Sequence, residues 1–412
     1  MDKRWGMQMG KTVTRIRCQA QAAGKLYLAG EYAVVEPGHP AVVVAVNRML
    51  TAEVTGCKGD EDTVNLSALV SDIDLQCGKI ESVGRPQDSL QWHREHGIIT
   101  PDSECAQNSY ILAALQTVEE LAVYKGVLVR PFDVSISSQL DADSCKKYGL
   151  GSSAAVTVAT VRALLQFYGI ELSPLATYKL AYLATGKAQS LGSGGDLAAS
   201  LFGGCIRFCS PDRIWVRSLA DQVPLAELVE RPWPGLAINR LDAFGDDSAL
   251  QLLVGWTGSP ASTPSLVASV KAGSADGKRH DYEEFLSSSD VCVDALARAL
   301  ETGDIAAVNN QIVRARDLLS GLSQLTDTAI ETDALRALVE IAAKYGGAAK
   351  SSGAGGGDCG IAIVAADHQA QAQSIEDAWA ASGIEPLGLA VSNELVPVQP
   401  WSPTESQENE AA

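Results

Sequence analysis

Hydrophobic and polar positions follow one another along the chain with two different periods, which predict a mixture of strands and helices. Small and β-branched apolar residues fill KLYLAGEYAVV and AVVVAV, and the turn EPGHP separates them. We therefore expect paired strands between Lys25 and Leu50. Apolar residues at spacings of three and four predict helices over residues 108–124, 154–169, 175–184, 283–301, 304–320, 327–345 and 369–382.

Shorter apolar runs bounded by turn residues predict further strands, near residues 131–138, 204–209, 213–219, 360–366 and 387–396. The segment 56–105 differs from these, since it is polar and rich in turn residues, and we expect loop character around GRPQDS. Helices and strands thus occur in both halves of the chain.

The chain has 412 residues, enough for two domains, because single cores rarely grow beyond about 250–300 residues. The segment PWPG at 232–235 is a suitable boundary between them. The Pro-rich, acidic end of the chain is expected to be disordered. The predicted organisation is an N-terminal extension over 1–21, a first domain over 22–232, a second domain over 233–396 and a tail over 397–412.

Composition and charge narrow the class of partner. Hydrophobic residues make up 46% of the chain and charged residues 20%, as in a well-packed globular protein. The net charge of −18 argues against nucleic acid or an anionic membrane as partner. No apolar run reaches the roughly 18 residues that span a bilayer, and the basic N-terminus lacks a hydrophobic signal core. The nine cysteines include no CxxC pair, which suits reduced thiols in a cytoplasmic protein.

Three glycine-rich turns are candidates for chemistry: GLGSS at 149–153, LGSGGD at 191–196 and SSGAGGGD at 351–358. Glycine permits positive φ and lets a ligand approach the backbone amides closely. A turn that leads directly into a helix also offers free N–H groups and a dipole that favour an anion. For GLGSS alone, a phosphate site and a helix simply capped by Ser152 or Ser153 are about equally plausible.

Two better-known phosphate motifs match only in part. The segment GMQMGKT at 6–12 resembles a Walker A loop, but only three residues separate its glycines where four are needed. Gly149, Gly151 and Ala154 have the spacing of a dinucleotide fingerprint. They follow the charged segment DADSCKKY, however, and not a buried strand, so this match is weak.

The motifs taken in order are more specific. Gly24-Lys25 with Gly30-Glu31-Tyr32, then GLGSSAA at 149–155 and SSGAGGGDCG at 351–360, resemble the three motifs of the GHMP kinases over roughly residues 22–395. Within that superfamily, KKYGLGSSAAV, GSGGDLAAS and VGWTGSPAS are most similar to the phosphomevalonate kinase family. The resemblance implies an α+β fold of two domains, a first one like domain 2 of ribosomal protein S5 and a second, ferredoxin-like one.

The resemblance also implies two catalytic residues. It places Lys25 beside the transferring phosphoryl group, where an ammonium would neutralise charge on the oxygens in the transition state. Asp196 matches an acidic residue near the acceptor, which alcohol kinases use as a general base. A phosphate acceptor has a second pKa of about 6 and is mostly ionised at pH 7. We therefore expect Asp196 mainly to orient Lys25 and position the acceptor, with capping of a helix at 197–201 as the simpler alternative.

The remaining implied contacts fall into three groups. The ATP phosphates are expected at Lys146, Lys147, Gly149, Leu150, Gly151, Ser152, Ser153 and Ala154. The acceptor is expected at Glu31, Tyr32, Lys187, Ser193, Gly194, Ser259, Ser262, Ser351, Ser352 and Gly353. Mg²⁺ would accompany ATP, with Ser153 as its protein ligand, because residues 180–195 contain no counterpart of the magnesium-binding glutamate of mevalonate kinases. For each lysine, the alternative is an ordinary solvated side chain.

The function implied is transfer of the γ-phosphoryl group of Mg-ATP to (R)-5-phosphomevalonate in the mevalonate route to isoprenoids, by a monomer or homodimer. An alternative with the same fold is another acceptor, such as mevalonate. An alternative of another class is a non-catalytic sensor of ATP and a metabolite. Such a sensor would be expected to lose Lys25 or Asp196 or to distort the phosphate turn, and all three are intact in the sequence.

Overall fold

The computed structural model describes residues 16–57, 77–83, 85–103, 108–141, 147–245, 248–259, 263–274 and 277–392. Most of the predicted N-terminal extension (1–15) and the whole predicted tail lie outside these ranges. No helix in the described ranges combines the length and the apolar character needed to cross a membrane.

The first part of the chain is built on an eight-stranded sheet. Its strands are β1 (Arg17–Ala29), β2 (Pro40–Gly56), β3 (Cys77–Ser82), β4 (Arg85–Glu95), β5 (Ile98–Pro101), β6 (Phe132–Ser138), β7 (Cys205–Cys209) and β8 (Ala237–Leu241). They are ordered β5-β4-β3-β6-β2-β7-β8, and β1 pairs with β2 in antiparallel fashion along almost its whole length. β6 and β7 pair with different halves of β2, and Lys25 faces Ala45 of β2 between those halves.

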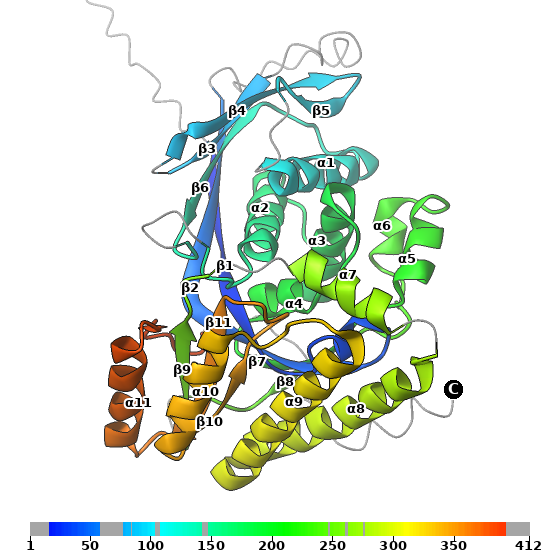
Figure 1. Cartoon of the computed structure of the whole chain (residues 1–412). Helices are drawn as coiled ribbons and strands as arrows, with labels where there is room; N and C mark the ends of the chain where they lie inside the picture. The colour runs from blue at the N-terminus through cyan, green and yellow to red at the C-terminus, as the bar shows by residue number, and fades with distance from the viewer. Residues whose placement is uncertain are drawn as a thin grey trace, which may run out of the picture.

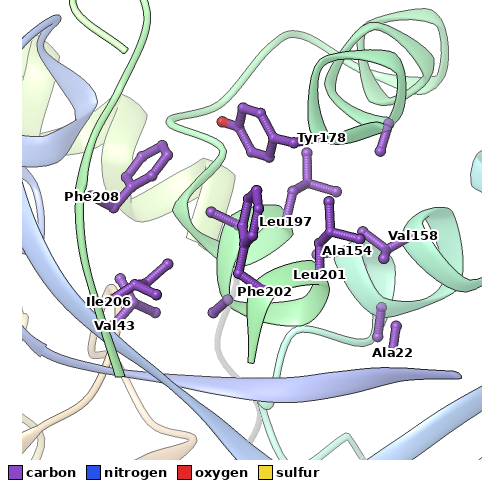
Figure 2. Packing of buried hydrophobic residues seen from close by; sticks show 14 of the residues in the cluster. Ala22, Val43, Ala154, Val158, Tyr178, Leu197, Leu201, Phe202, Ile206 and Phe208 are labelled. Carbon is purple, nitrogen blue, oxygen red and sulfur yellow. The ribbon is translucent and has the colours of Figure 1, made fainter. Parts of the chain in front are cut away.

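Helices cover one face of this sheet (Figure 1). They are α1 (Ser109–Tyr124), α2 (Ser152–Phe167), α3 (Pro174–Ala188) and α4 (Gly195–Phe202), with α5 (Arg213–Ala220), α6 (Leu225–Leu228) and the 3-10 turn η1 (Ala33–Val35) around them. Figure 2 shows Leu197 and Phe202 of α4 between Val158 of α2 and the strand residue Ile206. Each such buried side chain contributes about 1.5–3 kcal/mol, so α4 and the turn before it are anchored by apolar burial.

The second part carries a four-stranded sheet of β9 (Leu250–Trp256), β10 (Ala348–Ser351), β11 (Cys359–Ala365) and β12 (Glu385–Pro386). Its order is β10-β11-β9-β12, and every pair is antiparallel. The helices are α7 (Thr263–Gly273), α8 (Arg279–Thr302), α9 (Ile305–Thr326), α10 (Asp333–Lys344) and α11 (Gln369–Ala381). Helices separate β9 from β10, and α11 separates β11 from β12. This βαββαβ order is the ferredoxin-like arrangement expected from the sequence.

Three of the predicted elements are wrong. Residues 213–219 form helix α5, because Asp212 accepts hydrogen bonds from the N–H groups of Ile214 (2.9 Å) and Trp215 (3.0 Å) and so caps a helix. In the polar segment 56–105, loop character was expected around GRPQDS, but strand β4 begins there at Arg85, between β3 and β5. Near 387–396, the described residues contribute only the short strand β12 before 387 and an isolated bridge of Val391 with Val46.

The predicted domain boundary at 232 precedes β8, which pairs with β7 in the eight-stranded sheet. The first sheet therefore continues past that position. Residues 17–21 of the predicted extension likewise lie in β1. The division into 22–232 and 233–396 stays a proposal.

A histidine of the first part pairs with a carboxylate of the second part. His39 Nδ1 lies 2.9 Å from the Asp290 carboxylate of α8. The hydrogen bond with Asp290 raises the pKa of His39, the charges of Asp290 and Glu36 add to this, and partial burial opposes it.

We expect this pair to make stability depend on pH. Because the folded-state pKa of His39 is raised, its stabilisation is complete below the unfolded-state value of about 6.5 and is lost as the pH rises through the folded-state pKa. Unfolding free energies measured in urea from pH 5 to 9 should therefore differ most between wild type and His39→Gln at the acidic end. A difference independent of pH would contradict this assignment.

Candidate active site

The turn at Gly149–Ser153 has the backbone of an anion site. Gly149 (φ 80°) and Gly151 (φ 81°) are both left-handed, and Gly151 is the N-cap of α2 without a side-chain cap hydrogen bond. α2 begins at Ser152, so Ser152 and Ser153 lie in its first turn and neither is the cap. The first N–H groups of a helix have no partner within it. We call residues 149–153 the phosphate loop, because this end of α2 can hold an anion.

Lys25 lies directly against the phosphate loop. Its backbone N–H donates to the Leu150 carbonyl (2.8 Å), and its Nζ donates to the Gly149 carbonyl (3.3 Å). A β-carbon at Gly151 would come within 2.9 Å of the Lys25 side chain. The Nζ also lies 5.5 Å from the centroid of the Tyr27 ring. Lys25 is thus held by β1, the loop and an aromatic ring at one point.

A loop from the C-terminal part of the chain lies against both Lys25 and the phosphate loop. We call residues 351–358 the third loop, because they form the third glycine-rich turn of the sequence. The loop begins at the last residue of β10. Asp358 packs on Gly149 so closely that a β-carbon there would lie 2.3 Å from the Asp358 Cγ. A β-carbon at Gly353 would lie 3.9 Å from Lys25 Nζ. Gly149 therefore allows the two loops to approach each other, and Gly353 lies next to the lysine.

Residues 191–196, which we call the acceptor turn after the role expected from the sequence, approach the Tyr27 hydroxyl. The Tyr27 hydroxyl is 3.5 Å from Ser193 Oγ, and a β-carbon at Gly195 would be 2.5 Å from it. Asp196 is in the first turn of α4, where its Oδ1 accepts the N–H of Leu197 (2.9 Å); the N-cap is Gly194, so the capping alternative for Asp196 is wrong.

The negative charge of Asp196 affects the pKa of two nearby tyrosines. Burial raises the pKa of Tyr27, and the charge of Asp196 raises it further. The same carboxylate adds to the burial effect that raises the pKa of Tyr110 of α1, and the Ser153 side chain opposes this rise. The charge of Asp196 therefore acts on Tyr27, the ring against which Lys25 Nζ lies. Tyr110 was not nominated from the sequence, because no motif surrounds it.

Some predicted acceptor residues make other contacts. The Glu31 carboxylate and the Tyr32 side chain are buried: Glu31 pairs with Lys350, and the Tyr32 hydroxyl donates to the Ala354 carbonyl (2.5 Å). Ser352 Oγ accepts the Tyr27 N–H (2.9 Å) and lies 3.1 Å from the Tyr27 carbonyl, to which it donates. These residues hold the third loop against β1.

The backbone of Ser351 and Ser259 is used in a similar way. Ser351 is buried, and its carbonyl accepts Lys350 Nζ (2.5 Å). The Ser259 carbonyl accepts the Asp358 N–H (2.7 Å). Both serines therefore support the third loop through main-chain oxygens. Ser262, the other predicted acceptor serine in this region, lies outside the described residues.

The structure shows contacts for two of the predicted lysines. Lys187 Nζ pairs with Glu120 of α1 at 2.6 Å. Lys147 is exposed and bridges to Asp141 through the backbone, next to the loop. Lys146 lies outside the described residues.

Two family models match separate parts of the chain. The GHMP kinases N terminal domain matches residues 109–204, and the GHMP kinases C terminal domain matches residues 296–385. The first range contains the phosphate loop and Asp196, and the second contains the third loop.

Individual proteins match over most of the chain. A phosphomevalonate kinase from Streptomyces sp. (strain CL190) is 40% identical over 373 residues, 89% of this chain and 95% of that protein. The structure of Streptococcus pneumoniae phosphomevalonate kinase in complex with phosphomevalonate and AMPPNP has a TM-score of 0.73 and 30% identity, covering 91% of this chain and 99% of that one. A Lin0012 protein from Listeria innocua has a TM-score of 0.81 and 31% identity, covering 93% and 100%.

Proposed function

Because the chain belongs to the phosphomevalonate kinase family of the GHMP kinases, we propose that it transfers the γ-phosphoryl group of Mg-ATP to (R)-5-phosphomevalonate, giving (R)-5-diphosphomevalonate and ADP. The observation that carries this proposal is the position of Lys25 between the phosphate loop and the acceptor turn. The pneumococcal relative with phosphomevalonate and AMPPNP supports the pair of substrates.

The geometry divides the work between backbone and side chain. The N–H groups at the start of α2 would hold the phosphates of ATP, and the helix dipole would favour their charge. Lys25 would neutralise charge on the transferring phosphoryl group, since its ammonium reaches the rim of the phosphate loop. In a protein of net charge −18, such local cations and amides let two anionic substrates meet.

Mg²⁺ would be held mainly by the nucleotide. It binds phosphate oxygens and waters with one or two protein ligands, and the Ser153 hydroxyl at the start of α2 is a suitable one. The described residues contain no group of three or more His, Cys, Asp or Glu side chains that could form a separate metal centre. When bound, the cation would supply further neutralisation of phosphate charge.

Asp196 is proposed as an orienting group. The acceptor is a phosphate with a second pKa of about 6, so it needs little help to lose its proton at pH 7. We expect Asp196→Asn to lower kcat by about tenfold to a hundredfold through lost positioning, with a pH profile that keeps its shape between pH 6 and 9. Steady-state rates across that range test this. Complete loss of turnover, with a steep pH dependence near the pKa of a carboxylate or histidine, would instead make Asp196 the general base.

The oligomeric state, monomer or homodimer, and the cytoplasmic location stay predictions from the sequence. Size-exclusion chromatography with light scattering decides the first of them.

The proposed function is tested by coupled ADP release with Mg-ATP and three acceptors offered in parallel: phosphomevalonate, mevalonate and homoserine. Turnover confined to phosphomevalonate is the expected result. Turnover with mevalonate or homoserine would keep the fold and overturn the substrate. ATP binding without turnover on any acceptor would favour the sensor.

A further inference from the structure

A buried ion pair joins the two halves of the site. Lys350 of β10 donates to the carboxylate of Glu31, and the exposed fractions of the two side chains are 0% and 3%. Lys350 was not among the residues that the sequence nominated, and Glu31 was expected to contact the acceptor. The structure commits both charges to each other, at the point where β10 leads into the third loop.

The pair is the centre of a set of contacts between β1, η1 and the third loop. Lys350 Nζ also donates to the Ser351 carbonyl (2.5 Å), and the Gly353 N–H donates to Glu31 Oε1 (3.4 Å). Next to the pair, Ser352 Oγ makes two hydrogen bonds with the backbone of Tyr27. The Tyr32 hydroxyl donates a hydrogen bond to the Ala354 carbonyl. Through these bonds, four consecutive third-loop residues, 351–354, are tied to the pair or to the motif around Lys25.

Such a pair is a poor way to gain stability. Removing two charges from water costs several kcal/mol per ion, so a buried ion pair often stabilises a fold no more than well-packed apolar side chains would. It can instead hold the backbone around it in one place, since both hydrogen bonds to Glu31, from Lys350 Nζ and the Gly353 N–H, go to Oε1, while the buried Oε2 has no hydrogen-bond partner among the described residues. Here the backbone it holds is that of Gly353, which lies beside Lys25 Nζ.

We propose that Glu31 and Lys350 are positioning residues, whose buried ion pair sets the third loop over Lys25 and thereby shapes the acceptor side of the active site. This inference rests on the proposed function for its kinetic consequence, whereas the loop geometry itself does not depend on it. The pair bonds to the Ser351 carbonyl and the Gly353 N–H of the third loop, whereas the ATP phosphates are expected at the start of α2. Its loss should therefore weaken use of the acceptor more than binding of ATP.

A second buried ion pair provides a matched control. Arg94 of β4 pairs with Glu119 of α1, with exposed side-chain fractions of 0% and 6%, and the Tyr168 hydroxyl also donates to Glu119. This pair joins a strand and a helix of the first part of the chain. Breaking it costs comparable desolvation but leaves the contacts between the third loop and β1 in place.

The experiment compares Lys350→Met, Glu31→Gln and their double variant with Arg94→Met and Glu119→Gln. Two quantities are measured: hydrogen exchange of peptides covering 351–358, and kcat/KM for the acceptor together with the Kd for ATP. We expect Lys350→Met to speed exchange of the third loop and to lower kcat/KM for the acceptor by about a hundredfold. The Kd for ATP should change less than about threefold, and the double variant should lose less than the product of the single losses, because it leaves no unpaired charge.

Controls with similar thermal destabilisation should leave third-loop exchange and the acceptor kcat/KM near wild type. Unchanged third-loop exchange in Lys350→Met, or acceptor losses as large in the Arg94 and Glu119 variants, would overturn the positioning role. If wild type itself fails to turn over phosphomevalonate, the proposed function is wrong. The exchange comparison then still decides whether the pair positions the loop.

Discussion

Replacing Lys25 with alanine is expected to lower kcat by about a thousandfold or more, because a single charge acting on a transferring phosphoryl group contributes on that scale. The fold should survive, since Lys25 Nζ makes one long hydrogen bond of 3.3 Å to the protein, whereas the loop is anchored by the Lys25 backbone. Coupled ADP release and thermal unfolding, measured on the same preparation, check both parts.

Lys25→Arg tests whether a positive charge at this position is sufficient for activity. It keeps the charge, but Gly151 already approaches the Lys25 side chain so closely that a β-carbon would lie 2.9 Å from it. A larger guanidinium should displace the loop and restore little activity. If Lys25→Ala kept more than a tenth of wild-type kcat, the position of Lys25 at the phosphoryl group would be wrong.

Gly149→Ala is expected to be the most damaging change in the phosphate loop. Two penalties combine: its φ of 80° is strained for alanine, and the new β-carbon would lie 2.3 Å from the Asp358 Cγ. We expect the strain to cost about 1–2 kcal/mol. The overlap should push the third loop away from the phosphate loop, so that kcat/KM falls by about a hundredfold or more. Urea unfolding and steady-state kinetics measure the two effects.

Gly126→Ala separates the effect of backbone strain from the effect of the overlap with Asp358. Gly126 has a similar φ of 71°, but nothing lies within 4 Å of a β-carbon built there. This control should show the strain penalty in stability without a kinetic effect. Equal kinetic losses in the two variants would mean that the contact between Gly149 and Asp358 has no part in activity.

The sequence predicted those parts of the site that local backbone chemistry defines. Gly149 and Gly151 take the left-handed conformation that their residue type favours, and α2 starts at Ser152, directly after them. Lys25 is likewise at the phosphate loop, as its motif implied. The GHMP kinase fold is confirmed by the family models and by the ferredoxin-like order of the second sheet.

What the sequence did not predict depends on contacts between distant residues. Lys350 and Glu31 are 319 positions apart, and no local pattern marks a buried partner at that separation. The strand β4 was missed because Arg94 occupies a core position, which only its pairing with Glu119 makes possible. Lys187 was assigned to the acceptor from its nearness in sequence to the acceptor turn, yet α3 directs it to Glu120.

We propose that a phosphate oxygen accepts the phosphoryl group, and phosphorus NMR of the product distinguishes this from transfer to a hydroxyl. The sample is the full chain with Mg-ATP and (R)-5-phosphomevalonate. We expect two mutually coupled resonances of a new diphosphate ester, appearing in step with ADP and absent with Lys25→Ala. A new uncoupled phosphomonoester resonance would show transfer to a hydroxyl instead, and would contradict the account.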